Sequence, residues 1–230
     1  MKYIRKAENR GVANFGWLQS KHSFSFGNYY DPKHMGISVL RVINDDMVMP
    51  EQGFGEHGHR DMEIISYVIE GALKHEDSTG NSYLVPAGDV QRMSAGRGVT
   101  HSEFNASDTQ KVKFLQIWIQ PNVKGIKPSY QQKNIPQVGS LTTLVSPNGD
   151  NGALSINQDA SISRLVLNKD ECISLHTDKR IGYLHIIKGK MSVDKQTFKE
   201  GDAFAVGPAH TINVMAETVL EALWFDLPIA

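Results

Sequence analysis

Cysteine is nearly absent from this chain: Cys172 is the only one among 230 residues. One cysteine cannot close an intramolecular disulfide, which excludes an internally disulfide-bonded scaffold and favours a reducing compartment. No histidine or second cysteine lies at metal or nucleophile spacing from Cys172. We therefore expect Cys172 to be a small buried residue.

Long apolar runs are also missing. No segment approaches the ~20 consecutive apolar residues that a membrane-spanning helix needs. The basic residues in the amino-terminal "MKYIRKAENRGVANFGW" precede no apolar stretch of the kind found in a signal peptide. We expect a soluble cytoplasmic protein that makes no membrane contact.

An excess of charge of one sign is missing as well. The 24 Lys and Arg residues nearly balance the 25 Asp and Glu residues, for a formal net charge of −1. A nucleic-acid-binding protein gains affinity from a basic face that neutralises phosphates. This composition therefore predicts no direct contact with nucleic acid, and it leaves the oligomeric state open.

Short segments rich in β-branched and aromatic residues are abundant. They are bounded by Gly, Pro, Asn and Asp, as the strands of an all-β protein are, and helical periodicity is scarce. The segments that we expect to form strands include 37–43, 63–69, 113–119, 163–168 and 183–189.

A region rich in turn-forming residues, 121–152, divides the chain, and we expect it to be a connection. Similar patterns recur on either side of it: "YVIEG" is followed by "PAGDV", and "HIIKG" is followed by "KEGDAF". Each pattern predicts a strand ending at Gly, a hairpin, and a strand entered through Gly-Asp. We expect two similar β-barrels in tandem, residues 1–135 and 136–230.

Two pairs of side chains suggest a metal site in the first barrel. His57 and His59 are two residues apart, so on a strand they project from one face with Cα atoms about 6–7 Å apart. His101 and Glu103 have the same spacing. Two strands that each contribute two ligands can surround a single ion.

The fourth ligand could come from more than one carboxylate. Glu103 shares the face of His101, and we assign it. On an unbroken strand, Glu63 would lie roughly 13 Å beyond His59, so it reaches the ion only through a bulge or bend; a bulge-dependent or supporting role for Glu63 stays open. We expect Asp61 to be a solvated turn carboxylate.

These segments resemble a known family. "HGHRDME" followed by Gly71, and "GDVQRMSAGRGVTHSEFN" (88–105), resemble the two motifs of the cupin superfamily, although Ser94 stands where the second motif often has Pro. With "GWLQSKHSFSFGNYYDP" (16–32) and "LRVINDD" (40–46), they resemble the pirin family. The second half resembles the C-terminal cupin of bacterial pirin-like quercetin 2,3-dioxygenases. The resemblance implies an all-β bicupin fold of two double-stranded β-helix (jelly-roll) barrels, with the metal ligands His57, His59, His101 and Glu103.

The second barrel lacks an equivalent pair of ligands. His57 and His59 precede Gly71 by fourteen and twelve residues, and the same offsets before Gly189 reach Leu175 and Thr177. We expect the 136–230 cupin domain to carry no metal site and to serve packing or closure of the cavity. A metal analysis that finds two ions per chain at full occupancy would contradict this expectation.

Three neutral imidazoles and one carboxylate suit one divalent transition metal ion, and an octahedral ion would keep two positions open. We expect iron(II), with manganese, cobalt, nickel, copper and zinc as alternatives. The resemblance implies a dioxygenase that opens the heterocycle of a flavonol such as quercetin with O2 and releases CO; a related phenolic substrate is the near alternative. Glu103 is the candidate base for the substrate's 3-hydroxyl.

The same resemblance implies a rival function, because pirin-family members are associated with transcription regulation. In that interpretation the metal-bearing barrel is non-catalytic and binds a protein partner. Oxygen uptake and CO release with a panel of flavonols separate the two. We expect the three tryptophans, Trp17, Trp118 and Trp224, to lie in the core. His22, Phe24 and Phe26 are expected to pack in the core as well, with a substrate-lining role as the alternative. We expect His34 in a turn and His75 on a hairpin flank.

Overall fold

The computed structural model describes residues 1 and 3–229 of the chain. Strands in four sheets make up the regular structure of this part, apart from two short 3-10 turns, η1 (Ala7–Asn9) and η2 (Asp150–Gly152). None of the helical elements described is long and apolar enough to cross a membrane. The all-β prediction is confirmed.

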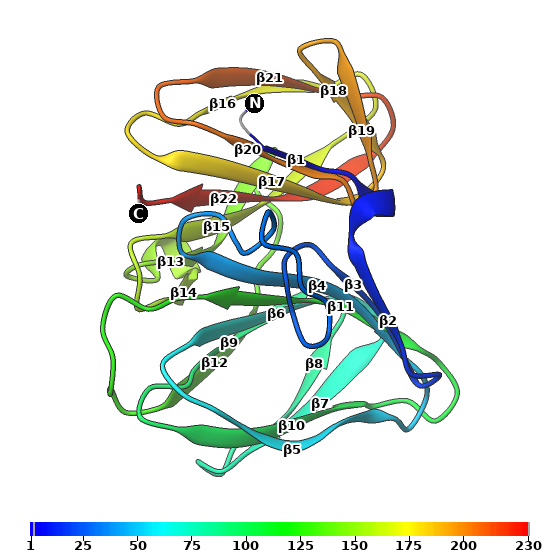
Figure 1. The fold of residues 1–230 in the computed structure, drawn as a ribbon, viewed down its shortest axis with the longest axis vertical. Helices are drawn as coiled ribbons and strands as arrows, with labels where there is room; N and C mark the ends of the chain where they lie inside the picture. The colour runs from blue at the N-terminus through cyan, green and yellow to red at the C-terminus, as the bar shows by residue number, and fades with distance from the viewer. Residues whose placement is uncertain (2, 230) are drawn as a thin grey trace.

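The first barrel pairs a large sheet with a small one, which form the lower two layers in Figure 1. The seven-stranded sheet has the order β12 (Ser129–Asn134), β9 (Asp89–Ser94), β6 (Glu63–Glu70), β11 (Val112–Ile119), β4 (Leu40–Val48), β3 (Leu18–His22) and β2 (Gly11–Asn14). The four-stranded sheet has the order β5 (Gly53–His59), β10 (Val99–Asn105), β7 (Ala72–Asp77) and β8 (Ser82–Pro86).

The second barrel repeats this arrangement. Its seven-stranded sheet has the order β1 (Tyr3–Arg5), β20 (Ala203–Val206), β17 (Ile181–Lys188), β22 (Leu220–Leu227), β15 (Ser161–Leu167), β13 (Leu141–Ser146) and β14 (Leu154–Ser155). Its four-stranded sheet has the order β16 (Cys172–His176), β21 (Thr211–Ala216), β18 (Lys190–Val193) and β19 (Gln196–Lys199). The run β9-β6-β11-β4 matches β20-β17-β22-β15, and the small sheets match strand for strand. The predicted bicupin fold is confirmed.

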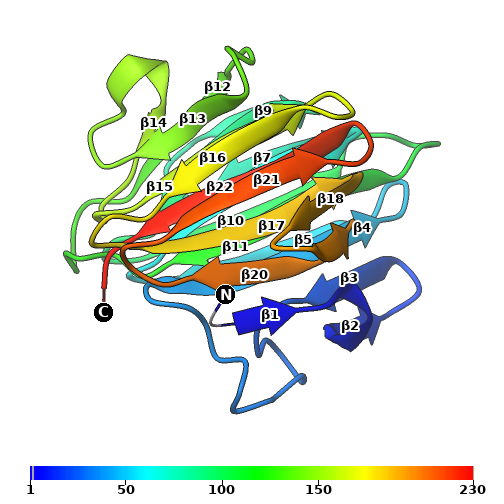
Figure 2. The ribbon, with the colours of Figure 1, turned by 90° about the horizontal axis from the view of Figure 1, so that it is seen from above.

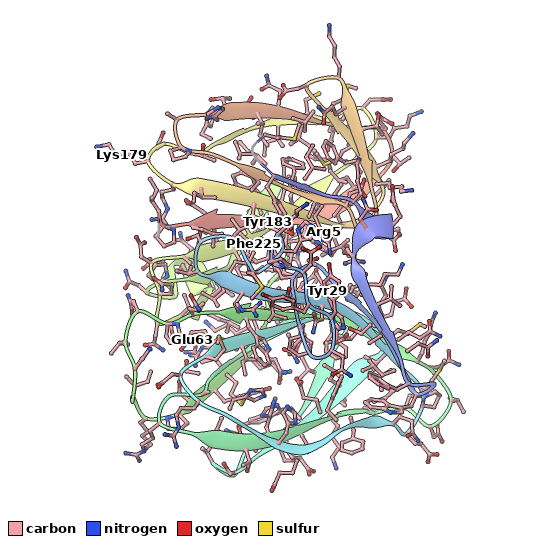
Figure 3. The ribbon with its side chains drawn as sticks, viewed as in Figure 1. Arg5, Tyr29, Glu63, Lys179, Tyr183 and Phe225 are labelled. Atoms are coloured by element: carbon pink, nitrogen blue, oxygen red, sulfur yellow. The ribbon has the colours of Figure 1, made fainter. Side chains whose placement is uncertain are left out.

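The two large sheets lie face to face between the two small ones, so the barrels are stacked (Figure 1). Because both faces of the large sheets are covered, their central strands are apolar along nearly their whole length. Side chains alternate between the faces. Ile65 and Tyr67 belong to a core that also contains Tyr183 and Phe225 of the second barrel, in the middle layer seen in Figure 3. That shared core joins the barrels.

The amino-terminal segment connects the two barrels. β1 pairs with β20 at the edge of the second barrel's large sheet, as Figure 2 shows from above, whereas β2 pairs with β3 in the first barrel. The side chain of Arg5 is buried and donates from Nε to the carbonyl of Ser23 (2.9 Å) and from Nη2 to the hydroxyl of Tyr29 (2.7 Å). Figure 3 shows Arg5 above Tyr29. A strand of one barrel is therefore fastened to the other.

The turn-rich region 121–152 contains more regular structure than the sequence predicted. Two strands lie within it: β12 is an edge strand of the first large sheet, and β13 is the second strand from the edge of the other. Their pattern is hidden because much of β12, "SYQQKN", is polar or exposed. The chain passes from the first large sheet to the second between Asn134 and Leu141. We propose that the boundary between the two domains, 135/136, lies in this passage.

Candidate metal centre

Three histidines meet on the inner face of the small sheet of the first barrel. His57 and His59 project from β5, and antiparallel pairing places His101 of β10 directly opposite His57. The ring centroids of His57 and His59 are 4.8 Å apart, and that of His101 lies 4.5 Å from His57 and 4.9 Å from His59. The shared face predicted from the i, i+2 spacing is the arrangement observed.

The donor atoms of the three rings have the spacing of ligands around one ion. One nitrogen from each ring lies within 4.8 Å of the other two, and the Nε2 atoms of His57 and His101 are 3.1 Å apart. Two nitrogens that each lie about 2.1 Å from an ion, at right angles, are separated by about 3 Å. The three rings therefore fit a single transition metal ion.

The surroundings keep two of these rings neutral. Burial lowers the pKa of His59 to about 4, assisted by the neighbouring His101 and His57. Burial likewise lowers the pKa of His101 to about 3, with His57 and His75 contributing. A neutral imidazole offers the lone pair that a metal requires, so both rings are ready to bind one at neutral pH.

Glu103 lies deeper in the barrel than the histidine triad. Its carboxylate forms a second cluster of possible metal ligands with His75 and His101. His101 therefore belongs to both clusters. Neutral donors hold it in place: Gln116 Nε2 donates to Oε2 (2.7 Å), and Gln91 Nε2 (2.7 Å) and Ser66 Oγ (3.1 Å) donate to Oε1. A break in the β5 register between His101 and Glu103 accompanies this placement. The structure thus brings Glu103 to His101 but not into the same cluster as His57 and His59.

His75 is the residue at this centre that the sequence reasoning missed. It was expected on a hairpin flank, but it is fully buried on β7, opposite Glu103 in the ladder. Its Nε2 atom lies 3.1 Å from Asp77 Oδ2, and its ring stacks on Tyr130 with centroids 4.6 Å apart. The signal was present, since His75 and Asp77 have the same i, i+2 spacing as the two pairs that were singled out.

Glu63 and Asp61 lie outside both donor clusters of the described residues. Glu63 is three residues from Ser66, which donates to Glu103, so strand alternation directs Glu63 to the opposite face of β6. There its carboxylate accepts hydrogen bonds from Ser94 Oγ (2.8 Å) and from Asn157 of the second barrel. Asp61 accepts a hydrogen bond from the backbone N–H of Gly125 (2.7 Å) in a turn with φ of 48°. Glu63 therefore supports the contact between barrels.

The role expected for Cys172 is wrong. The residue is exposed at the start of β16, because its place on an outer sheet turns the side chain to solvent. Trp118 was expected to be core, yet it is only partly buried and packs edge-on against His59, with ring centroids 5.0 Å apart. An aromatic wall therefore borders the histidine triad.

A cleft of about 500 Å³ lies near the centre. Phe26 lines the cleft and contacts Trp118, with centroids 5.4 Å apart. Asn44 also lines it and pairs in the ladder with Gln116, the amide that donates to Glu103. The aromatic lining residues are Phe15, Trp17, Phe26, Tyr29 and Phe54, and the polar ones include Ser20, His22, Asn44 and Asp46. Such a cleft suits a flat aromatic molecule that carries hydroxyl groups.

The second barrel has apolar side chains at most of the matching positions. Asn105 pairs with Leu73, which is two residues after Gly71, and Ala216 pairs with Met191, which is two residues after Gly189. These equivalent pairs align the two barrels position by position. The residues matching His57, His75, His101 and Glu103 are Leu175, Val193, Ile212 and Val214, all buried in that barrel's core. The offset predicted from the sequence for Leu175 agrees with this alignment. The expectation that this barrel has no metal site stays a prediction.

Comparison with known proteins identifies the family. The family model described as Pirin matches residues 4–119, and that described as "Quercetinase C-terminal cupin domain" matches residues 143–227. The chain belongs to the pirin family. This pirin is 45% identical over 231 residues to the quercetin 2,3-dioxygenase of Escherichia coli K12, covering 99% of each chain. It is also 44% identical over 221 residues to a putative quercetin 2,3-dioxygenase of Zymomonas mobilis, covering 93% of this chain and 92% of that one.

Solved structures agree with this assignment. The crystal structure of YhhW from Escherichia coli superposes with a TM-score of 0.96 at 44% identity, over 99% of this pirin and 98% of that chain. A second structure, bacterial pirin YhhW in complex with nickel(II), gives a TM-score of 0.95 at 44% identity over 99% of each chain. A divalent metal thus binds a pirin of the same fold, and the histidine cluster described above suits such an ion.

Proposed function

We propose that this pirin is a metal-dependent quercetin 2,3-dioxygenase, an oxidoreductase that uses O2 to open the heterocycle of a flavonol or a related phenolic and releases CO. The observation that carries the proposal is the convergence of His57, His59 and His101 next to buried Glu103 and an aromatic cleft. The name of the relatives, quercetin 2,3-dioxygenase, supports the substrate class.

The proposed ligands of the ion are His57, His59, His101 and Glu103. Glu103 belongs to an adjoining cluster that shares His101. Its hydrogen-bond donors are all uncharged, so none of them is a cation that would compete with a metal ion for the carboxylate. Iron(II) is the proposed metal, and the nickel(II) bound by the E. coli relative makes nickel the first alternative to test.

The chain's own residues prepare the substrate. The aromatic cleft binds the flat flavonol and excludes water, with the substrate's reactive edge directed past Trp118 and Phe26 toward the centre. Glu103 accepts the proton of the 3-hydroxyl, and the amides of Gln91 and Gln116 hold the carboxylate in place as it does so. A divalent ion held by these residues would supply positive charge that favours the deprotonated substrate, and would supply the chemistry that activates O2.

Oxygen uptake tests the proposal. Protein without a histidine tag is stripped of metal and reloaded with iron(II) or nickel(II), and O2 consumption and CO release are followed with a panel of flavonols. We expect both signals to depend on metal and to fall by at least about 100-fold in the His57→Ala variant. The matched control is His176→Ala, because His176 is exposed on the corresponding strand of the second barrel.

The result that contradicts the enzyme is metal binding without turnover. A protein that is fully loaded, shifts the absorption of no flavonol and consumes no O2 is not a flavonol dioxygenase. If such a protein captures a specific protein partner only when loaded, the regulatory alternative is favoured instead.

A further inference from the structure

Two buried ring nitrogens beside the metal centre have no hydrogen-bond partner among the described residues. They are Nδ1 of His75 and Nδ1 of His101. The side chains are 0% and 2% exposed, respectively, so bulk solvent does not reach them. An unpaired buried polar atom is costly and calls for an explanation. The two rings are neighbours, with centroids 5.4 Å apart and planes inclined by 53°.

The contacts of His75 indicate which of its nitrogens carries hydrogen. Nε2 lies 3.1 Å from Asp77 Oδ2. Every other contact of that carboxylate also comes from a donor: the N–H and hydroxyl of Thr79 and the N–H and side-chain amide of Asn81. Asp77 therefore acts as a pure acceptor, so Nε2 of His75 donates. In a neutral ring, Nδ1 is then left with a lone pair.

The hydrogen of His101 depends on whether metal is bound. Its Nε2 atom lies 3.1 Å from Nε2 of His57, whose Nδ1 donates to the carbonyl of Gly55, so Nε2 of His101 carries the hydrogen in the metal-free structure. The same distance suits two ligands of one ion, and a histidine that binds metal through Nε2 carries its hydrogen on Nδ1 and usually donates it to a partner that fixes the ring. With metal bound, His101 would therefore have a donor with no acceptor, and His75 next to it has an acceptor with no donor.

We propose that His75 is a positioning residue for the metal centre. The two Nδ1 atoms are not hydrogen-bonded in the metal-free structure. When an ion engages Nε2 of His101, Nδ1 of His75, whose tautomer Asp77 fixes, accepts the Nδ1–H of His101 and holds the Nε2 lone pair of His101 toward the ion. The stacking of Tyr130 on His75, and of Tyr83 on Tyr130 (5.1 Å between centroids), keeps the ring in place. The inference rests on the metal site of the proposed function, but not on flavonol turnover.

A direct test reads the tautomers. The protein labelled with 15N is loaded with zinc, which is diamagnetic, and long-range 1H–15N spectra show which nitrogen of each histidine carries hydrogen. We expect hydrogen on Nε2 of His75 and on Nδ1 of His101, with one zinc ion per chain. Hydrogen on Nδ1 of His75 overturns the proposal. So does a second zinc ion bound by His75 and Glu103, because His75 would then be a ligand itself.

Three substitutions separate positioning from packing. His75→Phe keeps the ring that stacks on Tyr130 but has no acceptor, and we expect it to weaken zinc affinity by about 10- to 100-fold. His75→Asn places a carbonyl oxygen near the position of Nδ1, and we expect an affinity within about threefold of the parent protein. His75→Gln retains a donor toward Asp77 but displaces the acceptor, and we expect it to resemble His75→Phe.

Zinc affinity is measured by competition with a chromophoric chelator, after thermal melting has shown that each variant is folded. If packing is the only role of His75, the Phe variant binds zinc like the parent and the Asn variant is the weakest, which contradicts the proposal. Should the Phe variant fail to fold, the tautomers of the parent protein still decide. Neither readout involves flavonol, so a failure here is distinct from a failure of the dioxygenase function.

Discussion

Glu103 and Asp46 are both buried carboxyl groups in the first barrel, but their surroundings differ. Glu103 accepts hydrogen bonds from Ser66, Gln91 and Gln116. Asp46 has an oxygen, Oδ1, with no hydrogen-bond partner among the described residues. Burial of a carboxyl oxygen that lacks a donor favours the protonated form of Asp46.

The substitution Glu103→Gln should separate metal binding from turnover. The amide keeps the size of the side chain and one ligand oxygen but cannot accept a proton, so we expect metal affinity within about tenfold of the parent and turnover lowered by at least about 100-fold. Metal content and O2 uptake measure the two effects. The matched control is Glu76→Gln, an exposed carboxylate on adjacent β7. Turnover like that of the parent would refute the role of Glu103 as base.

The carboxyl of Asp46 should make the stability of the metal-free protein depend on pH. Burial raises the pKa of Asp46 from 3.8 to about 7, opposed by a contact with Ser20 and reinforced by Asp45 and Glu103. Between these two pH values the folded state binds more protons than the unfolded state, so the free energy of unfolding falls as pH rises and stays lower above pH 7.

The variant Asp46→Asn removes this dependence. Its stability relative to the parent should grow from about pH 4 to about pH 7, by up to a few kcal/mol at about 1.4 kcal/mol per unit of pKa shift. Urea denaturation in the presence of a chelator measures it. Asp108→Asn, an exposed position, is the control. Parallel curves of stability against pH for parent and Asp46→Asn would show that Asp46 is charged in the folded protein.

The sequence predicted the residues of the site as far as local spacing extends. The i, i+2 rule placed His57 with His59, and the strand pairing opposite them brought His101 into the same cluster. His75 was missed because its hairpin reads as polar and exposed, and only the closure of the barrel buries it. Cys172 was misplaced for the opposite reason, since composition does not tell which face of an outer strand meets solvent.

At the level of strands, glycines mark where each barrel turns from its large sheet to its small one. Gly71 links β6 to β7 with φ of 74°, and Gly189 links β17 to β18 with φ of 91°. A Cβ atom at Gly71 would lie 2.9 Å from the carbonyl oxygen of Lys111 and 3.2 Å from Cα of Val112. Both the backbone angle and the close approach therefore require glycine.

Replacement of Gly71 by Ala should cost more stability than the same change at a glycine that has a positive φ angle but no close neighbours. Gly80 has φ of 93° with open space around it. We expect Gly80→Ala to cost about 1–2 kcal/mol, from the backbone angle alone, and Gly71→Ala to cost at least about 1 kcal/mol more. Urea denaturation of the two variants gives the comparison. Equal losses would show that the β11 backbone yields to the added methyl group.

The strands that the sequence predicted best are those buried on both faces. Segments 63–69 and 113–119 match β6 and β11 to within one residue at either end. Strands β12 and β13 were assigned to a connection, because β12 at the sheet edge and β13 next to the edge are only partly buried and carry no continuous apolar pattern. Pattern alone is therefore informative in the centre of these sheets and weak at their edges.

For the molecule as a whole, the shared core between the large sheets makes the two barrels depend on one another. Polar contacts cross the same layer: the hydroxyl of Tyr67 donates to Glu221 (2.6 Å), and the backbone N–H of Asn157 donates to Glu63 (3.3 Å). Arg5 of β1 adds its bonds to Ser23 and Tyr29. Opening one barrel would expose the apolar face of the other.

We expect the two barrels to unfold in one transition. The fluorescence of Trp224 reports on the second barrel in a Trp17→Phe/Trp118→Phe variant, and that of Trp17 and Trp118 reports on the first in Trp224→Phe. For each variant, the urea unfolding curve measured by tryptophan fluorescence should coincide with the curve measured by circular dichroism. Arg5→Met should lower both midpoints together and reduce the free energy of unfolding by about 1.5–3 kcal/mol. This loss should exceed that of Lys6→Met, whose side chain is partly exposed. Separate midpoints within one variant would show that the barrels are independent.

In the second barrel, four apolar side chains occupy the positions that His57, His75, His101 and Glu103 occupy in the first. They are Leu175, Val193, Ile212 and Val214. These four side chains offer no ligand atom to an ion, so we expect the second barrel to keep its shape without metal and, through the shared core, to support the first. We expect the metal-free protein to stay folded but inactive in a metal-starved cell, and to regain activity when metal is added, without synthesis of new protein.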